Sequence, residues 1–385
     1  MLIYFIPIII ALIGAFLNGR LTAVSRKLLY IITTVVAIFV YCCVYLNGSD
    51  WPNYEEFFNQ VTWSNLIQLS SERGFEIGFT FVLFCFKSIG FGFFPFLIVA
   101  KSFSLIVISN FFKRYAKEQG QGYSANVFFL LFMFYAGNCM YLYVETIIRF
   151  SMALAIVVYA YRFLLNRRFW PYLFYIIIAV TFHRTAILML PIYFIHRTTI
   201  PNKVWIIIFA FLIVLLTPQF LLMFIESISQ FIPQIYYIYL KGYMEFAVIN
   251  GSNILSIGNV VHLFFLLLCL LERKRITTCF NNGDKLFIYV IVFFLLYYIT
   301  VYAGSIGRIS LYFRPIFIIV FASILSSNKI FKTLILSFVV LYFLLGMRNV
   351  IIEKKSFLPY TNYFISVLSG DNLSFEERIS CSNKD

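Results

Sequence analysis

Four arginines are the residues of this chain whose type and placement could do chemistry: Arg149, Arg184, Arg308 and Arg314. Each lies within or beside a long apolar run with almost no other charge, where a guanidinium is costly and usually marks a function. Its planar fork can make two parallel, charge-assisted hydrogen bonds to a phosphate group, which a lysine cannot reproduce. We interpret the four as pyrophosphate ligands. The alternative, that each only anchors a helix end, stays open.

Two further residues could accept a proton. His183 lies at a break in an apolar stretch, and the unperturbed pKa of histidine is close to neutral, which suits a general base. A histidine in a membrane helix can equally serve only to hydrogen-bond a neighbouring helix. Glu145 lies four residues before Arg149, so on one helix it is either a second candidate for the base or half of an ion pair. Asp50 and Glu76 rank third for the role of base.

Composition places the chain in a membrane. Of its 385 residues, 62% are hydrophobic, 21% aromatic and only 12% charged, which is typical of a polytopic membrane protein. The net charge of +14 could suggest nucleic acid. However, the basic residues fall in short loops between apolar segments, so topology explains them and we expect no nucleic-acid partner. Chelating acidic residues are scarce in the apolar runs, so we predict no metal and no cofactor.

The apolar segments predict the fold class. Segments of about 20 residues can cross the bilayer as helices, and their number predicts an all-α polytopic protein with about twelve transmembrane helices. We interpret residues 1–18 as the first of these spans. The stretch 172–195 is expected to cross twice, with a break near His183. The apolar segments are 2–18, 28–46, 94–112, 124–142, 146–165, 172–195, 204–220, 254–271, 286–303, 309–325 and 331–346.

Loop charge predicts the orientation. Basic loops should face the cytoplasm, whereas the acidic or neutral segments belong outside. We therefore expect a single transmembrane domain over residues 1–348, with periplasmic loops at about 47–93 and at 219–253, the latter between the eighth and ninth spans. Residues 349–385 should form an external, partly disordered C-terminal segment. All four arginines then fall in the outer half of the membrane or at its external face.

Five short runs of the sequence form an ordered set of motifs. They are Asp50-Trp-Pro-Asn-Tyr54, Glu76-Ile-Gly78-Phe79, Glu145-Thr-Ile-Ile-Arg149-Phe-Ser-Met-Ala-Leu-Ala155, Thr181-Phe-His183-Arg184-Thr-Ala186 and Gly307-Arg308-Ile-Ser-Leu-Tyr312-Phe313. In their order and spacing, over most of the chain, they resemble the EpsG/Wzy type of bacterial polysaccharide polymerases. The sequence departs from that pattern at Phe79, where an aromatic hydroxyl is common, and at Arg184, where a small or polar residue is expected.

The resemblance implies a fold similar to the GT-C membrane glycosyltransferases and a reaction at the periplasmic face of the bacterial inner membrane. Its partners would be an undecaprenyl-pyrophosphate-linked oligosaccharide donor and acceptor, the lipid bilayer and a chain-length regulator in the membrane. The arginines would stabilise the departing pyrophosphate electrostatically, without a metal. Asp50, Tyr54, Glu76 and Tyr312 become candidates for binding the sugar or acceptor. O-antigen is the leading expectation for the product.

Two alternatives stay open. A ligase of similar fold would transfer the glycan to a lipid A core, but such ligases carry a histidine in a large external loop, and residues 219–253 contain none. A flippase or transporter for the same lipid-linked oligosaccharide would need cations at several depths and usually has internal repeats. The chain has no repeat between its halves, so a polymerase is favoured over both alternatives.

Overall fold

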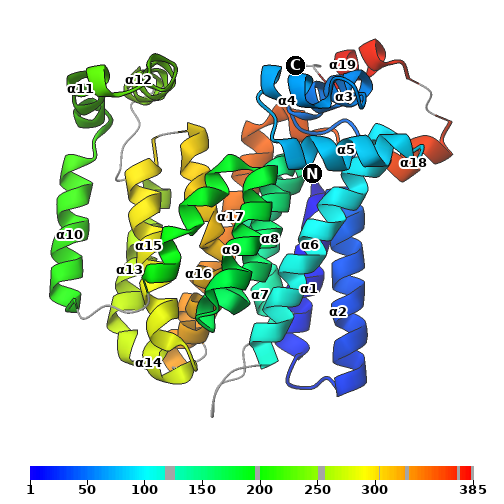
Figure 1. The fold of residues 1–385 in the computed structure, drawn as a ribbon. Helices are drawn as coiled ribbons and strands as arrows, with labels where there is room; N and C mark the ends of the chain where they lie inside the picture. The colour runs from blue at the N-terminus through cyan, green and yellow to red at the C-terminus, as the bar shows by residue number, and fades with distance from the viewer. Residues whose placement is uncertain are drawn as a thin grey trace. The chain divides into compact units, whose positions relative to one another are not determined.

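The computed structural model describes residues 1–117, 126–195, 200–249, 256–302, 304–325, 329–370 and 373–382. These residues fold almost entirely into helices (Figure 1). The one β pairing among them is an isolated antiparallel bridge between Val44 and Asn362. The predicted all-α class is therefore confirmed.

Within the described ranges, six helices are long and apolar enough to cross a membrane, and a bent helix pair could make a seventh. Six further apolar helices are only 10–17 residues long, shorter than a typical span. The chain is thus a polytopic helical protein, and the total of about twelve crossings stays a prediction. The six long helices are Ala23–Cys42, Phe93–Ala116, Val127–Val144, Ile148–Leu165, Gly283–Thr300 and Leu334–Glu353, and the bent pair is Asn202–Ile213 with Pro218–Ser227.

The chain divides into two compact units, where the sequence suggested one transmembrane domain over 1–348. The first comprises Met1–Glu118, Ser124–Leu190 and Leu325–Asp385, and the second is built on Pro191–Ile324. Residues 119–123, also assigned to the second unit, lie outside the described residues. The C-terminal part of the chain therefore returns to the unit that contains the N-terminus.

Long helices packed side by side form the body of the first unit. Helix α1 packs on α7, α6 on α8, and α8 on α9. Because successive helices alternate in direction, the α1–α2 connection, the end of α6 and the α8–α9 connection share one end of this unit (Figure 1). These three connections are basic, and their cytoplasmic orientation stays a prediction. The helices are η1 Leu2–Phe5, α1 Ile6–Leu17, α2 Ala23–Ala37, η2 Ile38–Cys42, α6 Phe93–Lys117, α7 Val127–Phe134, η3 Tyr135–Val144, α8 Ile148–Leu165, α9 Phe169–Phe182 and α17 Lys329–Glu353.

Short helices gather at the other end of the first unit. Helices α3 (Trp51–Gln60), α4 (Leu66–Glu72) and α5 (Ile77–Ser88) come from the predicted external segment 47–93. They lie beside α18 (Tyr363–Leu368) and α19 (Phe375–Ser382) of the C-terminal segment (Figure 1).

Hydrogen bonds and an ion pair hold the C-terminal segment at this end of the unit. Asn47 accepts a hydrogen bond from the Thr361 backbone at 2.9 Å and donates one to the Pro359 carbonyl at 2.7 Å. Arg378 of α19 pairs with Glu55 of α3 at 2.5 Å. Residues 375–382 are thus helical where the sequence suggested disorder, and α17 continues to Glu353, past the predicted boundary at 348.

The apolar stretch around His183 folds back on itself. Helix α9 ends at Phe182, His183 is extended, with φ −155° and ψ 116°, and the 3-10 helix η4 (Arg184–Met189) follows. The Tyr172 hydroxyl donates to the Met189 carbonyl, so the two arms lie side by side. The predicted break near His183 is therefore confirmed.

The second unit has its own apolar core, in which the rings of Phe293 and Phe317 stack at 5.0 Å. Its predicted external loop, 219–253, forms α11 and α12 as far as residue 249, and residues 250–253 lie outside the described residues. The helices are η5 Pro191–Phe194, α10 Asn202–Leu215, α11 Pro218–Ser227, η6 Ser229–Phe231, α12 Gln234–Ile249, α13 Ile257–Leu271, α14 Arg273–Cys279, α15 Gly283–Thr300, η7 Gly304–Tyr312 and α16 Arg314–Leu325.

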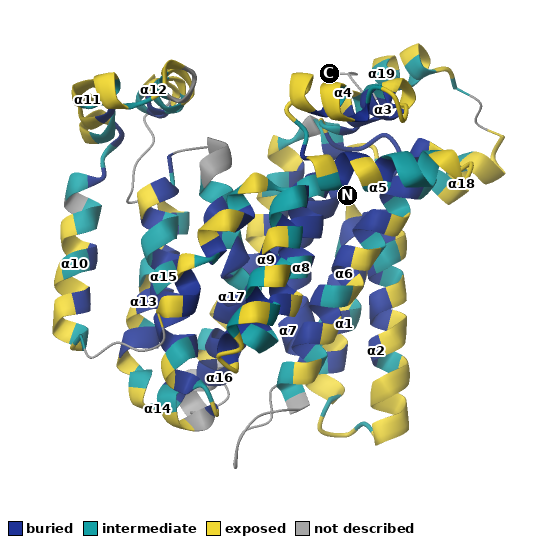
Figure 2. Ribbon diagram, viewed as in Figure 1, coloured by how far each residue is buried: buried dark blue, intermediate teal, exposed yellow. Residues whose placement is uncertain are grey.

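Burial separates the interior of each unit from its outward faces (Figure 2). Large apolar side chains are exposed along the outer helices, as with Phe16, which is 71% exposed, and Phe174, which is 59% exposed. A soluble monomer rarely exposes so much apolar surface. These faces are therefore suited to contact with lipid.

Gly78 gives a testable constraint on this fold. A Cβ at this position would lie 2.2 Å from Thr181 Oγ1 and 2.8 Å from the Thr181 carbonyl oxygen. We expect Gly78→Ala to force α5 away from α9 and to destabilise the protein by about 1–3 kcal/mol, measured by thermal unfolding in detergent. Gly92→Ala is the control, because its Cβ would meet nothing closer than 3.6 Å. Equal stability of the two variants would contradict this packing.

Candidate functional site

Helix α5 places an acidic residue beside the break in α9. Glu76 stands immediately before the first residue of α5. Two residues later, Gly78 allows the backbone of α5 to touch Thr181, near the end of α9. Phe79 is fully buried and meets the rings of Tyr54 and Phe75. At this position the chain uses an apolar ring for packing.

The Glu76 carboxylate binds two of the predicted arginines. Its Oε2 lies 2.6 Å from Arg149 Nη1. Its Oε1 accepts from the Arg184 backbone N–H at 3.1 Å and lies 3.6 Å from Arg184 Nε. The Gly74 carbonyl also accepts from both guanidinium groups, at 3.3 and 3.4 Å. Two cations therefore meet at one carboxylate.

The two arginines differ in their surroundings. Arg149 also donates to the Tyr54 hydroxyl at 3.3 Å, and its guanidinium lies over the Phe75 ring, 4.5 Å from the centroid. Its side chain is 22% exposed, whereas that of Arg184 is 65% exposed. Arg149 is thus held in place on several sides, while Arg184 presents most of its guanidinium to the surroundings.

Tyr54 lies at the centre of this group of charges. Burial raises the pKa of its hydroxyl, and the negative charges of Asp50 and Glu76 raise it further, although Arg149 lowers it. The net direction is upward, so the phenol stays protonated and able to donate a hydrogen bond. The structure thus brings together Asp50, Tyr54, Glu76 and Arg149, which the sequence had singled out separately.

Glu145 has different partners from those that the sequence suggested. Helix α8 begins only at Ile148, and Thr146 adopts a left-handed φ of 67°. Glu145 and Arg149 are therefore not on one continuous helix, so the alternative in which they form an ion pair was wrong, and the role of Glu145 as a base stays a prediction. Oε1 of Glu145 instead lies 2.8 Å from the hydroxyl of Ser49 and 2.7 Å from Nζ of Lys354. Within the described part of the chain, Oε2 is buried without a hydrogen-bond partner.

A buried lysine supports the turn between Glu145 and Arg149. Lys101 of α6 is 1% exposed, and its Nζ donates to Thr146 Oγ1 at 3.1 Å. A left-handed backbone is strained for a β-branched residue and persists only where its surroundings hold it. Sequence reasoning missed Lys101, although a lysine inside the apolar segment 94–112 was a usable signal. It also missed Lys354, for which the sequence gave no local signal.

Arg149 and Arg184, which meet at Glu76, form the arginine cluster of the first unit. His183 is adjacent to this cluster in the chain, since it precedes Arg184. Its Nδ1 lies 2.7 Å from the Thr185 hydroxyl, and its ring meets Phe150 edge-on with centroids 5.4 Å apart. The side chain is half-buried. These contacts orient the imidazole, and its role as a base stays a prediction.

The other three predicted site residues lie in the second unit. Arg308 and Tyr312 are on η7, and Arg314 is the first residue of α16. Tyr312 is fully buried, and both arginines are half-buried. The His262 ring of the same unit stacks on Tyr297 with centroids 4.3 Å apart. The convergence of all four arginines on one ligand stays a prediction.

The donors in the first unit are suited to an anion. They are two guanidinium groups and a phenol, and the Glu76 carboxylate and the Gly74 carbonyl accept from the guanidinium groups. Across the described ranges, His, Cys, Asp and Glu side chains do not assemble in groups of three or more that could hold a metal ion. An arginine fork that is already oriented is the usual protein ligand for a phosphate group.

Comparison with known proteins identifies the family. The model of the EpsG family matches residues 27–362. No curated protein and no solved structure matches the chain. The matched range includes the arginine cluster of the first unit and the Arg308 motif of the second. Because the match covers most of the sequence, the chain belongs to the EpsG family.

Proposed function

We propose that this protein is a polysaccharide polymerase. It joins oligosaccharide repeat units carried on undecaprenyl pyrophosphate, by metal-independent glycosyl transfer, and releases undecaprenyl pyrophosphate. The observation that carries the proposal is the pair Arg149 and Arg184 held at Glu76, in a member of a family with polymerase-type function.

The two arginines have complementary roles in this reaction. Hydrogen bonds to Glu76, Tyr54 and Gly74 hold Arg149 in place, so its positive charge has a fixed position. Arg184 is largely exposed, so its fork can bind an incoming pyrophosphate. When the bond between the sugar and the phosphate oxygen breaks, negative charge grows on the leaving group. Preorganised cations stabilise that charge more strongly than they stabilise the substrate.

The acceptor hydroxyl must lose a proton as its oxygen bonds to the sugar. His183, next to Arg184, is our first candidate for the base that takes this proton. Glu145 is the second, since its Oε2 is buried without a partner among the described residues. Asp50 and Tyr54 are proposed to bind the sugar or acceptor, and Arg308, Arg314 and Tyr312 keep their predicted roles as ligands of pyrophosphate and sugar.

The proposed location is the bacterial plasma membrane, with the site facing the periplasm. The basic loops and the arginine cluster lie at opposite ends of the first unit (Figure 1), and basic loops favour the cytoplasm. A GT-C-like fold and a chain-length regulator as partner belong to the same proposal. O-antigen is our favoured product.

Reconstitution tests the function. We expect the purified protein in nanodiscs to convert an undecaprenyl-pyrophosphate repeat unit into a ladder of products on a gel, with the same rate when a chelator is present. A single transfer to lipid A core without a ladder would support the ligase instead. Movement of the intact substrate across liposomes, with no ladder, would support the flippase and overturn the enzyme.

Lysine substitutions test the two arginines. Because lysine keeps the charge but loses the fork, Arg184→Lys should lower the polymerisation rate about tenfold or more and leave thermal unfolding unchanged. Arg149→Lys should lower both the polymerisation rate and the thermal unfolding temperature, since the buried hydrogen bonds of Arg149 stabilise the fold by about 1–3 kcal/mol. Arg73→Ala is the control, because Arg73 pairs with Glu56 at an exposed site nearby. Full activity of Arg184→Lys would show that this arginine is only an anchor.

Neutral substitutions distinguish the two candidate bases. We expect His183→Gln to lower kcat by about 10²-fold or more, with little change in KM. Glu145→Gln should lower kcat no more than Lys354→Met does, because each removes the same ion pair. Lys354→Met should be the less stable of the two, because it leaves the buried Glu145 carboxylate unpaired. A much lower kcat for Glu145→Gln than for Lys354→Met would transfer the role of base to Glu145.

A further inference from the structure

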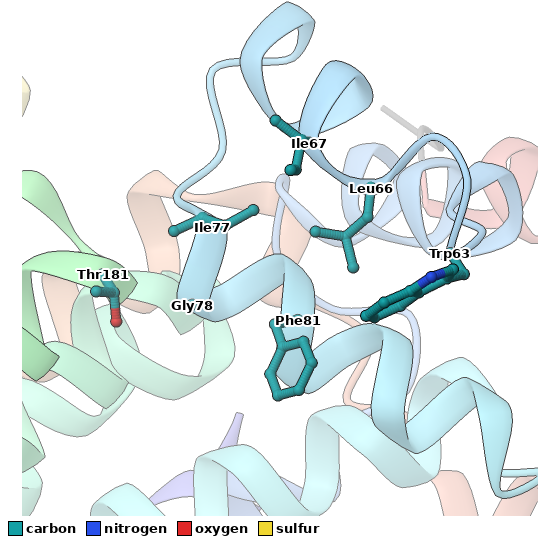
Figure 3. A pocket seen from close by; sticks show the side chains of 7 residues that line it. All are labelled: Trp63, Leu66, Ile67, Ile77, Gly78, Phe81 and Thr181. Atoms are coloured by element: carbon teal, nitrogen blue, oxygen red, sulfur yellow. The ribbon is translucent and has the colours of Figure 1, made fainter.

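An apolar groove adjoins the arginine cluster of the first unit. Its lining side chains come from the α4–α5 region, with Thr181 of α9 at one side (Figure 3). Its volume is about 370 Å³, at the lower end for small-molecule pockets. Three of its apolar side chains are strongly exposed, Ile67 at 77%, Trp63 at 70% and Phe81 at 48%. The lining residues are Trp63, Leu66, Ile67, Ile77, Gly78, Phe81 and Thr181.

The residues that line the groove adjoin those of the arginine cluster in the chain. Ile77 and Gly78 follow Glu76 directly in the chain, and Thr181 lies three residues before Arg184. The close contact of Gly78 with Thr181 joins the two segments. The exposed guanidinium of Arg184 therefore belongs to a segment that adjoins the apolar groove. This order of charge and apolar surface matches an amphiphile with an anionic head and a hydrocarbon chain.

We propose that this groove binds the first isoprene units of the polyprenyl chain of a lipid-linked substrate, with its pyrophosphate at Arg184. The inference rests on the proposed function, because that function supplies the amphiphile. Branched apolar chains gain free energy when they leave water for contact with side chains such as Ile67 and Phe81. The groove holds only the part of the carrier nearest the pyrophosphate, and the rest stays in the bilayer.

The position of α5 allows entry from the membrane. Figure 1 shows α5 lying across the end of the first unit that carries the arginine cluster. Exposed apolar side chains on such a helix, together with an exposed tryptophan, are typical of the boundary between hydrocarbon and headgroups. A carrier in the outer leaflet can then reach the groove laterally, without passing its chain through water.

Photo-crosslinking tests the occupant directly, without catalysis. The probe is a polyprenyl pyrophosphate with a diazirine on its first isoprene units and no sugar, added to the full-length protein in nanodiscs. We expect adducts on residues 63–81 that decrease with excess undecaprenyl pyrophosphate and persist with excess phosphatidylglycerol. Adducts elsewhere, or equal competition by phosphatidylglycerol, would overturn the proposal in favour of an ordinary lipid contact.

Kinetics with two carriers test the groove in the reaction. We expect the wild type to favour undecaprenyl over a two-isoprene carrier through KM, and the double variant Ile67→Ser, Phe81→Ala to reduce that preference about tenfold. Phe103→Ala is the matched control, since Phe81 and Phe103 are both 48% exposed. If the double variant makes a ladder and keeps its preference for undecaprenyl, the groove proposal is overturned but the polymerase proposal is not. If the probe crosslinks to residues 63–81 but no ladder forms, the polymerase proposal is overturned but the groove proposal is not.

Discussion

The first unit depends on the burial of one carboxylate between two cations. A guanidinium such as that of Arg149 is stable in a mostly enclosed position only if its charge and its donors are satisfied. Glu76 satisfies them, and it also receives the backbone N–H of Arg184. This single side chain therefore links the start of α5, the start of α8 and the break after α9. Without it, two arginines would repel one another at the same site.

The left-handed turn at Thr146 determines which acidic residue pairs with which cation. An uninterrupted helix would place Glu145 one turn before Arg149 and pair the two. The turn, supported by Lys101, directs Glu145 toward Ser49 and Lys354 instead. Arg149 is then left to Glu76, and the C-terminal segment gains an ionic contact close to the site. The two carboxylates thus have separate partners.

The sequence predicted the features that local patterns encode. Hydropathy gave the helical class, and the polar interruption at His183 gave the break after α9. Sequence reasoning singled out Arg149, Glu76, Tyr54 and Asp50. It did not predict their contacts, because Arg149 lies 73 and 95 positions from Glu76 and Tyr54, and such distant residues carry no local sign of proximity. The possible ion pair between Glu145 and Arg149 does not form, because a left-handed threonine, which is rare and has no sequence signature, interrupts the helix. The helix of residues 375–382 was missed because its docking through Arg378 and Glu55 is likewise a long-range contact.

The charge balance of the cluster bears on how the proposed reaction could proceed. Arg149 and Arg184 bring two positive charges to the site, and the Glu76 carboxylate offsets part of this charge. Negative charge grows on the departing carrier, so fixed cations stabilise the transition state more strongly than the bound substrate. Glu76 holds the Arg149 guanidinium and the Arg184 backbone N–H in place. The buried carboxylate would therefore serve catalysis as well as folding, because cations that are already oriented need no rearrangement as the sugar leaves.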